Sequence, residues 1–156
     1  MTLYSHPKRL PVAERTVVSA LTSQALLSVP PSASIHEAAV LMAQLACGSA
    51  LVLSAGTVVG IVTERDILAK IVAKLLDPAK TSVESIMTKD PVCVRPEMPV
   101  PHALFIMKEL GFRHLPVVDD DHVPLGVFAL RDALPDELAG ADVLIRSAEQ
   151  LAATLR

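Results

Sequence analysis

The chain has 156 residues, of which 51% are hydrophobic and 20% are charged, and its formal net charge is −3. This composition is typical of a globular protein and excludes a disordered tail, and the length suits one domain or two small units that share a core. Aromatic residues make up only 3%. Because nucleic-acid binders need a basic surface or aromatic stacking platforms, we expect no nucleic-acid partner.

The beginning of the chain and one long uncharged segment bear on location. Residues 1–10 are polar and contain no apolar stretch behind a basic start, so we expect no signal peptide and a cytoplasmic location. Cys47 and Cys93 offer no disulfide framework and are expected to be free thiols. Ala38 to Thr63 contains no charged residue, but two polar clusters divide it into helix and strand lengths. We therefore expect no membrane span.

The first half of the chain predicts, in order, a strand, a helix, two strands and a helix. Ser34 and Glu37 have the spacing of a capping box at the start of the first helix, whose apolar stripe runs from Ile35 to Leu45. A proline after Asp77 ends the second helix. The predicted strands are Leu27–Val29, Ala50–Leu53 and Val58–Val62, and the second helix is Asp66–Leu76.

The second half of the chain predicts the same order of elements. Pro101 suits the first turn of a helix and Gly111 its end, and the apolar stripe of this helix runs from Val100 to Leu110. A last helix is predicted to start near Arg131. The predicted strands are Val92–Val94, Leu115–Val118 and Leu125–Phe128, and residues 135–156 form a helical tail with Leu138, Val143, Leu144, Leu151 and Leu155 as apolar contacts.

The two halves align as an internal repeat. A shift of 65 residues pairs identical residues along both halves, and after one extra residue in the second hairpin the shift becomes 66. The constant register, with one insertion in a predicted turn, predicts a duplication. The identical pairs include Val29 and Val94, Met42 and Met107, Val52 and Val117, and, with the longer shift, Gly60 and Gly126 as well as Asp66 and Asp132.

Several motifs carry a resemblance to a known family. Gly60–Asp66 and Gly126–Asp132 each run from a strand into a helix, Gly111–Asp119 precedes the second of them, and Val83–Thr88 precedes the strand at Val92. In this order and spacing the sequence resembles a tandem pair of CBS domains, the Bateman module first named from cystathionine β-synthase. The resemblance implies an α/β (α+β) fold of two pseudo-symmetric β-α-β-β-α repeats packed as one module. The boundaries that we predict are residues 1–15 for an N-terminal extension, 16–76 for the first repeat, 77–134 for the linker and second repeat, and 135–156 for the C-terminal helical tail.

The resemblance also implies a function. Such pairs are regulatory modules that bind adenosine-containing ligands, such as AMP, ATP or S-adenosylmethionine, in clefts between the repeats. The sequence contains no evident nucleophile–base pair and no glycine-rich phosphate loop, so we do not expect an enzyme. The alternative is a structural dimerisation or interaction module without a physiological ligand. We expect a homodimer in either case, because the Asp66–Leu76 helix is apolar over a wide arc, and any regulated partner would be a separate protein.

The family pattern implies two clefts of unequal strength and assigns roles to individual residues. In the second cleft Ala129 stands where the first has Thr63, so one ribose contact is missing and weaker binding is expected. The implied residues are Thr63, Asp66 and Asp132 for the ribose; Val92 and Cys93, or Leu27 and Ser28 in the second cleft, for the adenine; and Arg113, His114 and Arg131 for the phosphates.

Other interpretations of these residues stay open on the sequence alone. Thr63 and Asp66 also have the spacing of a helix cap, and the two roles can coexist because a capping hydroxyl keeps a free lone pair. The three phosphate candidates could equally be solvated or paired with a nearby acid. Residues 119–122, Asp-Asp-Asp-His, could suggest a cation site. Three acids at a hairpin tip are more typical of a solvated turn, and we predict no metal site.

Overall fold

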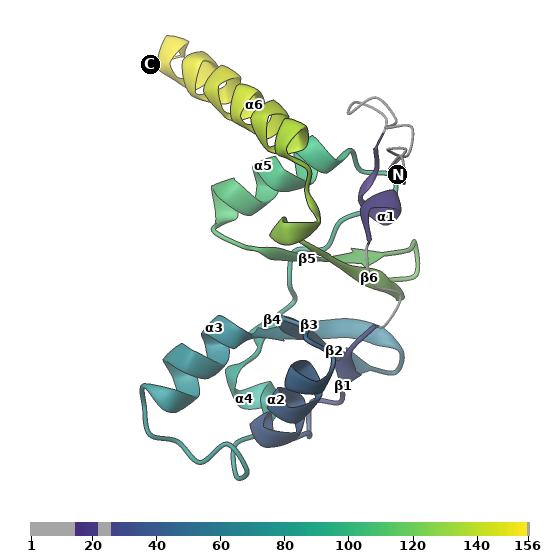
Figure 1. Ribbon diagram of the computed structural model, residues 1–156, viewed down its shortest axis with the longest axis vertical. Coiled ribbons are helices and arrows are strands. Elements are labelled where there is room, and N and C mark those ends of the chain that lie inside the picture. Colours follow the sequence, from purple (N-terminus) through teal and green to yellow (C-terminus); the bar gives the residue numbers. More distant parts are fainter. Residues whose placement is uncertain (1–14, 22–25, 156) are drawn as a thin grey trace, which may run out of the picture.

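The computed structural model describes residues 15–21 and 26–155. It contains two lobes, each with a sheet and helices, stacked along the long axis of the molecule (Figure 1). The first lobe has a sheet in the order β1-β2-β3-β4, and in the second lobe β5 and β6 form an antiparallel pair. This arrangement confirms the predicted mixed fold. The strands are β1 (Ser28–Val29), β2 (Ser49–Ser54), β3 (Thr57–Thr63), β4 (Thr88–Lys89), β5 (His114–Val118) and β6 (Pro124–Ala129).

The two lobes use the same strand pairing at equivalent positions. In the first lobe β1 runs parallel to β2, with Val29 opposite Val52. In the second lobe a single parallel bridge joins Val94 to Val117, the residues that lie 65 positions later in the sequence. The predicted strand of the second repeat is thus reduced to this bridge, because prolines on both sides lack the N–H groups that would extend the ladder. The equivalent pairing supports the duplication inferred from the sequence.

The first long helix of each repeat has the capping residue that the sequence predicts, at its start in the first repeat and at its end in the second. At the start of α2 (Ile35–Gln44) the Ser34 N–H donates to the Glu37 carboxylate at 2.7 Å, and the Glu37 N–H donates to the Ser34 hydroxyl at 3.1 Å. α5 (Val100–Leu110) ends at Gly111, which has a left-handed conformation with φ of 73°. The apolar stripe of each helix enters the hydrophobic core of its own lobe, except for its last residues, Leu45 and Leu110, which are exposed.

The helix after β3 is shorter than the sequence predicts. Instead of one helix over Asp66–Leu76, α3 (Glu64–Ile67) continues only as a π-helical turn, Leu68–Val72. Leu75 has φ of 55°, a left-handed conformation that cannot continue a right-handed helix. Ile71 is buried in the core, but most other apolar side chains of this segment are exposed. Much of the apolar arc is therefore uncovered within one chain.

The end of the second repeat also differs from the prediction. The helix expected near Arg131 is only a 3₁₀ turn, Leu130–Asp132, and the regular helix α6 (Pro135–Thr154) follows after a short extended segment. The backbone extends there because a proline disfavours the helical conformation in the residue before it. α6 packs against α5 and buries Ala141 and Ile145. Of the tail residues expected to make apolar contacts, Leu138, Val143, Leu151 and Leu155 are exposed within one chain. Leu138 borders a cavity between α5 and α6 together with Ala141 and Ile145, one and two turns further along the same face.

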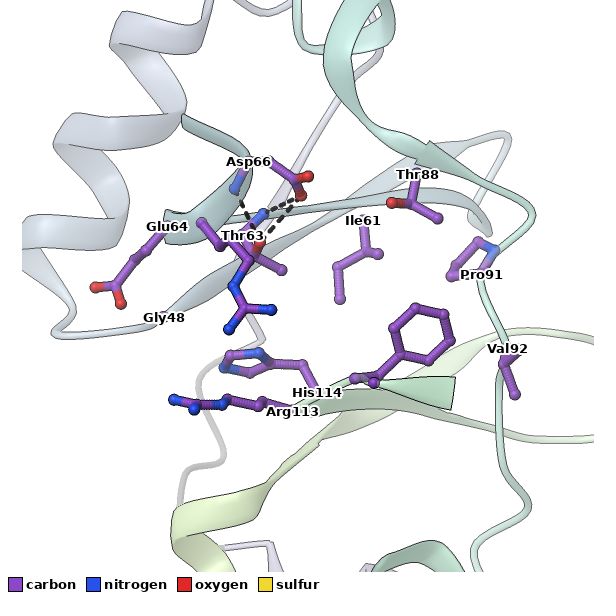
Figure 2. Close-up of a pocket in the computed structure, with 13 residues that line it drawn as sticks. Gly48, Ile61, Thr63, Glu64, Asp66, Thr88, Pro91, Val92, Arg113 and His114 are labelled. Atoms are coloured by element: carbon purple, nitrogen blue, oxygen red, sulfur yellow. Dashed lines mark hydrogen bonds between the residues drawn. The ribbon is translucent and has the colours of Figure 1, made fainter. Parts of the chain in front are cut away.

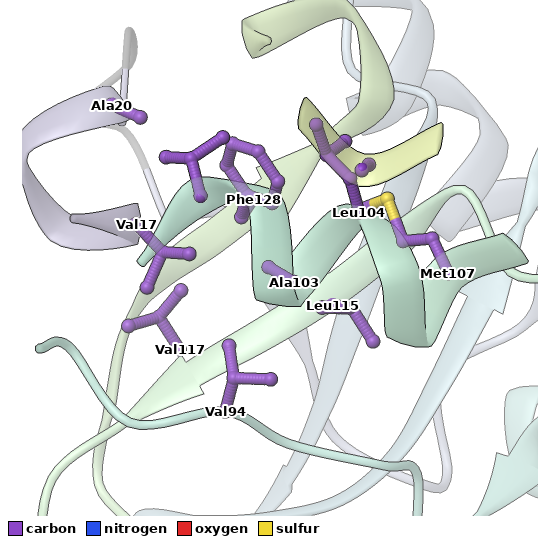
Figure 3. Packing of buried hydrophobic residues seen from close by; sticks show 11 residues of the cluster. Val17, Ala20, Val94, Ala103, Leu104, Met107, Leu115, Val117 and Phe128 are labelled. Carbon is purple, nitrogen blue, oxygen red and sulfur yellow. The ribbon is translucent and has the colours of Figure 1, made fainter. Parts of the chain in front are cut away.

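The repeats exchange their first short helices. α1 (Val17–Ala20) lies beside β6 in the second lobe, and α4 (Val83–Ile86) lies in the first lobe near α2 (Figure 1). Figure 3 shows the side chain of Val17 inside the hydrophobic cluster of the second lobe. Each core is therefore completed by residues from the other half of the sequence, and the packing crosses the predicted boundary between residues 16–76 and 77–134.

A buried ion pair joins the segment before α1 to α6. The Glu137 side chain has no solvent exposure, and its two carboxylate oxygens accept hydrogen bonds from the Arg15 guanidinium at 2.9 and 2.8 Å. The Leu134 N–H donates to the same carboxylate at 2.7 Å. Arg15 also donates to the Asp132 carbonyl at 3.2 Å. The pair thus holds the turn that carries Asp132 against the start of the described chain.

Two segments with unusual composition have ordinary structures. The uncharged stretch from Ala38 to Thr63 forms most of α2 together with β2 and β3, and nowhere in residues 15–21 and 26–155 is a helix both long and apolar enough to cross a membrane. At the acidic hairpin tip, the Asp119 carboxylate accepts from the N–H groups of Asp121 and Val123, both at 2.9 Å. Among the described residues, no three His, Cys, Asp or Glu side chains gather as a metal site would require.

Candidate functional site

A cavity of about 370 Å³ lies between the two lobes, and we call it the larger cavity because it exceeds its counterpart of about 60 Å³ at the equivalent turn of the second repeat. A third cavity, of about 400 Å³, lies beside α5 and α6. Small-molecule sites typically have volumes of roughly 300–1,000 Å³, so the larger cavity has room for a ligand. Its walls come from the β3–α3 turn, from the segment after β4 and from the segment between α5 and β5 (Figure 2). The lining residues are Gly48, Ile61, Thr63, Glu64, Arg65, Asp66, Thr88, Pro91, Val92, Gly111, Phe112, Arg113 and His114.

The β3–α3 turn places a carboxylate and a hydroxyl on one wall of the larger cavity. The Thr63 N–H and hydroxyl both donate to Asp66 Oδ2 at 3.0 Å, and the Asp66 N–H donates to Thr63 Oγ1 at 3.3 Å (Figure 2). Asp66 Oδ1 forms an ion pair with Lys70 Nζ at 2.9 Å, and Lys70 also donates to the Ile86 carbonyl at 2.7 Å. The helix cap that the sequence allowed is therefore present, and both capping residues also line the cavity.

The opposite wall presents positively charged and aromatic side chains. Gly111 ends α5 in a left-handed conformation, and the chain then carries Phe112, Arg113 and His114 along the cavity. Arg65, from the first turn of α3, lines the cavity as well. Burial lowers the pKa of His114 below its usual value. The Arg113 guanidinium and the His114 imidazole thus face the carboxylate–hydroxyl wall across one space, and Arg65 adds a second guanidinium from the α3 side. This arrangement suits a ligand with a polar middle and an anionic end.

Apolar surface closes a third side of the larger cavity. Pro91 and Val92 follow β4, and Ile61 of β3 lies nearby (Figure 2). Cys93, predicted together with Val92 to contact an adenine ring, is not among the described residues that line the cavity. Its thiol donates to the Pro91 carbonyl at 3.3 Å, and burial raises the pKa of this thiol. The structure therefore brings the Val92 side chain to the cavity but turns the Cys93 thiol toward its own backbone.

A smaller cavity of about 60 Å³ lies at the equivalent turn of the second repeat. Asp132 lines it, and Asp132 Oδ2 accepts a hydrogen bond from the Ala129 N–H at 2.8 Å. This is the same backbone bond that Thr63 donates to Asp66 in the first repeat. The two turns therefore have matching backbone geometry, but the alanine supplies no hydroxyl and the space beside it is much smaller.

Three further predicted residues belong to the region of the smaller cavity. Of the two residues predicted to contact an adenine in the second cleft, Leu27 lines this cavity, whereas Ser28 is not among its described lining residues. Arg131 was predicted to reach phosphates in the larger cavity, but it lines the smaller one, and its guanidinium donates to the Ala46 carbonyl at 3.4 Å. Arg131 lies there because it belongs to the turn after β6, whose residues Ala129 and Asp132 also line the smaller cavity.

The sequence analysis missed several residues of the larger cavity. Gly48 and Glu64 meet there because the Glu64 N–H donates to the Gly48 carbonyl at 3.1 Å, a contact between the start of β2 and the start of α3. Thr88 reaches the wall because β4 pairs with β3, which no local pattern indicated. Phe112 lies inside a motif that the sequence analysis quoted, and its position between Gly111 and the basic residues was the available signal.

Comparison with known proteins agrees with this architecture. The family model described as the CBS domain matches residues 18–73 and 83–135. An uncharacterized 17.7 kDa protein of Acidianus ambivalens is 38% identical over 118 residues, which are 75% of this chain and 70% of that protein. The CBS domain-containing protein CBSCBSPB5 of Arabidopsis thaliana is 34% identical over 143 residues, 91% of this chain. The chain spans only 26% of the length of that Arabidopsis relative.

Solved structures show the same fold. A CBS domain protein of Pyrobaculum aerophilum in complex with AMP matches with a TM-score of 0.74 and 28% identity, over 83% of this chain and 99% of that one. The CBS domain pair of protein MJ0100, in complex with 5′-methylthioadenosine and S-adenosyl-L-methionine, matches with a TM-score of 0.68 and 28% identity, over 76% of this chain and 91% of that one. With two matched copies in tandem and this shared fold, the chain belongs to the CBS domain family.

Proposed function

We propose that this chain is a regulatory, non-catalytic module that binds an adenine nucleotide or a related adenosyl compound in the larger cavity. One observation carries the proposal: a carboxylate–hydroxyl pair, an apolar patch and a cationic wall meet in one cavity of about 370 Å³. These three surfaces suit the ribose, the base and the phosphate of a nucleotide. Two proteins of the same fold were solved with AMP and with adenosyl compounds, which supports the same ligand class here.

In this proposal each part of the ligand meets a different wall. A ribose diol donates two hydrogen bonds to a carboxylate, and a capping hydroxyl still has a free lone pair to accept another. An adenine ring lies against apolar side chains and forms hydrogen bonds with the neighbouring backbone, both as donor and as acceptor. The assigned residues are Thr63 and Asp66 for the ribose, Val92 and the Cys93 backbone for the adenine, and Arg113 and His114 for the phosphates. Arg131 contributes only after releasing the Ala46 carbonyl, to which it donates.

We also propose that the two cavities bind unequally. A volume of about 60 Å³ is too small for a nucleotide, so Asp132 and Leu27, with Ser28 nearby, form at most a weak site. Ala129 in addition lacks the hydroxyl of Thr63. A missing hydroxyl bond costs about 1 kcal/mol and a missing charge-assisted contact about 1.5–3 kcal/mol. The expected gap in affinity for a phosphorylated ligand is therefore roughly one to three orders of magnitude.

Titration calorimetry with AMP, ATP and S-adenosylmethionine tests both proposals. The Asp66→Ala variant is expected to lose tight binding, because both acceptor oxygens for the ribose disappear. The Asp132→Ala variant makes the same change at the equivalent position and is expected to leave the tight site nearly unchanged. Far-UV circular dichroism checks that both variants fold. Equal losses, or the reverse ranking, would show that the cavities are assigned wrongly, and failure of all three ligands to bind the wild type would favour a purely structural module.

The same cavity suggests how binding is transmitted. Its walls belong to both lobes, so a ligand that contacts both is bound best in one relative arrangement of the lobes and shifts the population toward it. Hydrogen exchange on saturation with the ligand should then slow beyond the cavity, including at the exchanged helices α1 and α4. Protection confined to the lining residues would indicate simple binding without a regulatory rearrangement.

A separate observation supports self-association. Leu68, Val72 and Leu75 have exposed fractions of 62%, 58% and 93%, and they form an apolar face that the chain itself leaves uncovered. We propose that a second copy of the chain covers this face, since neighbouring large apolar side chains in water favour association. Sedimentation should show a homodimer rather than a monomer of 16.6 kDa. Leu68→Glu should produce monomers, whereas the control Val123→Glu, at the exposed hairpin tip, should remain dimeric. A wild type that is monomeric at tens of micromolar would refute the proposal.

A further inference from the structure

The two cavities share one wall. Gly48, next to the start of β2, and His114, at the start of β5, are the two residues that line both the larger and the smaller cavity. The imidazole of His114 therefore stands between a space large enough for a nucleotide and a space that holds little more than water. Any change in the charge of this ring therefore changes the electrostatic potential in both cavities.

The glycine at position 48 is what makes room for the ring. A Cβ atom at this position would lie 3.0 Å from His114 Nε2 and 3.4 Å from His114 Cε1. Contacts this short would require the imidazole to move by a few tenths of an ångström. The glycine thus leaves room for the Nε2–Cε1 edge of the ring next to the backbone at position 48, within the shared wall.

The charges around His114 come from both cavities. Burial is the main cause that lowers the pKa of His114, and the Arg131 guanidinium and the neighbouring Arg113 act in the same direction. The carboxylates of Glu64 and Asp132 act in the opposite direction but do not outweigh these causes. The imidazole is therefore mainly uncharged at neutral pH, although it stands at the wall where an anion is proposed to bind.

We propose that His114 takes up a proton when a phosphorylated adenosyl ligand occupies the larger cavity, so that this cavity discriminates phosphorylated from unphosphorylated ligands more strongly as the pH falls. A phosphate next to the ring stabilises the imidazolium form, because an opposite charge within a few ångströms favours the charged state. The proton comes from the solvent and binds to a ring nitrogen, and no covalent bond changes. The inference rests on the proposed nucleotide site and adds a pH-dependent specificity to it.

The expected effect follows from linkage. If one proton is taken up per bound ligand, the affinity for AMP rises by up to tenfold for each pH unit of acidification, while the affinity for adenosine hardly changes. The phosphate of AMP itself titrates near pH 6, so it contributes its own proton exchange. A comparison of protein variants with the same ligand cancels the ionisation of free AMP. Direct spectra of His114 separate the protonation of the ring from that of the bound phosphate.

The experiment is titration calorimetry with AMP and with adenosine at pH 7, in two buffers of different ionisation enthalpy. The wild type should take up more protons with AMP than His114→Gln does, and the two proteins should agree with adenosine. His102→Gln, the same substitution at an exposed histidine on α5, is the matched control and should behave as the wild type. Equal proton uptake by wild type and His114→Gln, with AMP still bound, would overturn this inference but not the proposed site.

A second measurement does not depend on the folding of a variant. Nitrogen-15 spectra of the histidine side chains in the wild type report the protonation of His114 directly, with and without saturating AMP. Its titration midpoint should move to higher pH with AMP and stay in place with adenosine. A midpoint that AMP leaves unchanged, with AMP bound, would overturn the inference. Failure of the wild type to bind AMP, ATP and S-adenosylmethionine would overturn the proposed function together with it.

Discussion

The ion pair between Arg15 and Glu137 offers a sharp test of how the N-terminal segment supports the second lobe. The Glu137 side chain is fully buried, while that of Arg15 is 19% exposed. Replacing Arg15 by methionine keeps much of the apolar stem but removes two hydrogen bonds to the carboxylate and one to the Asp132 carbonyl. Among the described residues, the carboxylate then keeps the bond from the Leu134 N–H alone.

The decrease in the free energy of unfolding caused by Arg15→Met can be bounded. Removing one partner of a buried ion pair typically costs about 3–5 kcal/mol, because the other charge stays buried without compensation. Partial access of water at Arg15 places the expected loss near the lower end, about 3 kcal/mol. For a chain of this length, that loss corresponds to a decrease in Tm of roughly 6–12 °C. Arg15→Met/Glu137→Leu should recover part of the loss, since it removes both charges together.

Denaturant unfolding followed by circular dichroism measures these differences. The control is Arg146→Met, which makes the same substitution at an exposed position on α6 and should stay within about 0.5 kcal/mol of the wild type. A decrease below about 1 kcal/mol in the free energy of unfolding for Arg15→Met would refute the reasoning. It would mean that the Glu137 carboxylate finds water or other partners in the folded state.

Three further predictions follow from the site. Ala129→Thr restores the missing hydroxyl, but the cavity of about 60 Å³ should still exclude a nucleotide, so calorimetry should give one ligand per chain and not two. Gly111→Ala places a Cβ at φ of 73° with no atom within 4 Å, so conformational strain alone should cost about 1–2 kcal/mol in a denaturant titration, and an unchanged midpoint would argue against it. Because the folded-state pKa of His114 is lowered, the unfolded chain binds more protons as the pH falls through about 6.5, and stability is lost there. His114→Gln should therefore lose less stability than the wild type between pH 7.5 and 5.5, and an equal loss would contradict this sign.

Local chemistry in the sequence determined the turns that frame the larger cavity. The stop at Gly111 and the turn from Thr63 to Asp66 depend on residues only a few positions apart, so short-range hydrogen bonds and backbone preferences decide them. The same holds for the capping box at Ser34, which starts α2. The register of the repeat also holds in the structure, because duplicated strands bury the same faces and therefore pair in the same way.

The length of the helix after Asp66 and the buried face of the tail helix were harder to predict from the sequence. The apolar pattern after Asp66 is compatible with a long helix, but the chain leaves the helical conformation by Leu75, where the local pattern contains no glycine. The tail pattern likewise offered several apolar faces, and its helix packs on the one that carries Ala141 and Ile145. Which face of α6 is buried depends on the shape of α5, so the sequence of α6 alone does not predict that face.

Only the tertiary structure decided which half of the chain completes which core and which cavity is large. α1 and α4 are short apolar helices that either core could accept from composition alone, yet each packs in the lobe of the other repeat. Glu137 finds its partner 122 positions away, and Arg131 turns to the smaller cavity. These features depend on contacts between residues far apart in the chain, whose burial and spacing arise only when the two lobes pack together.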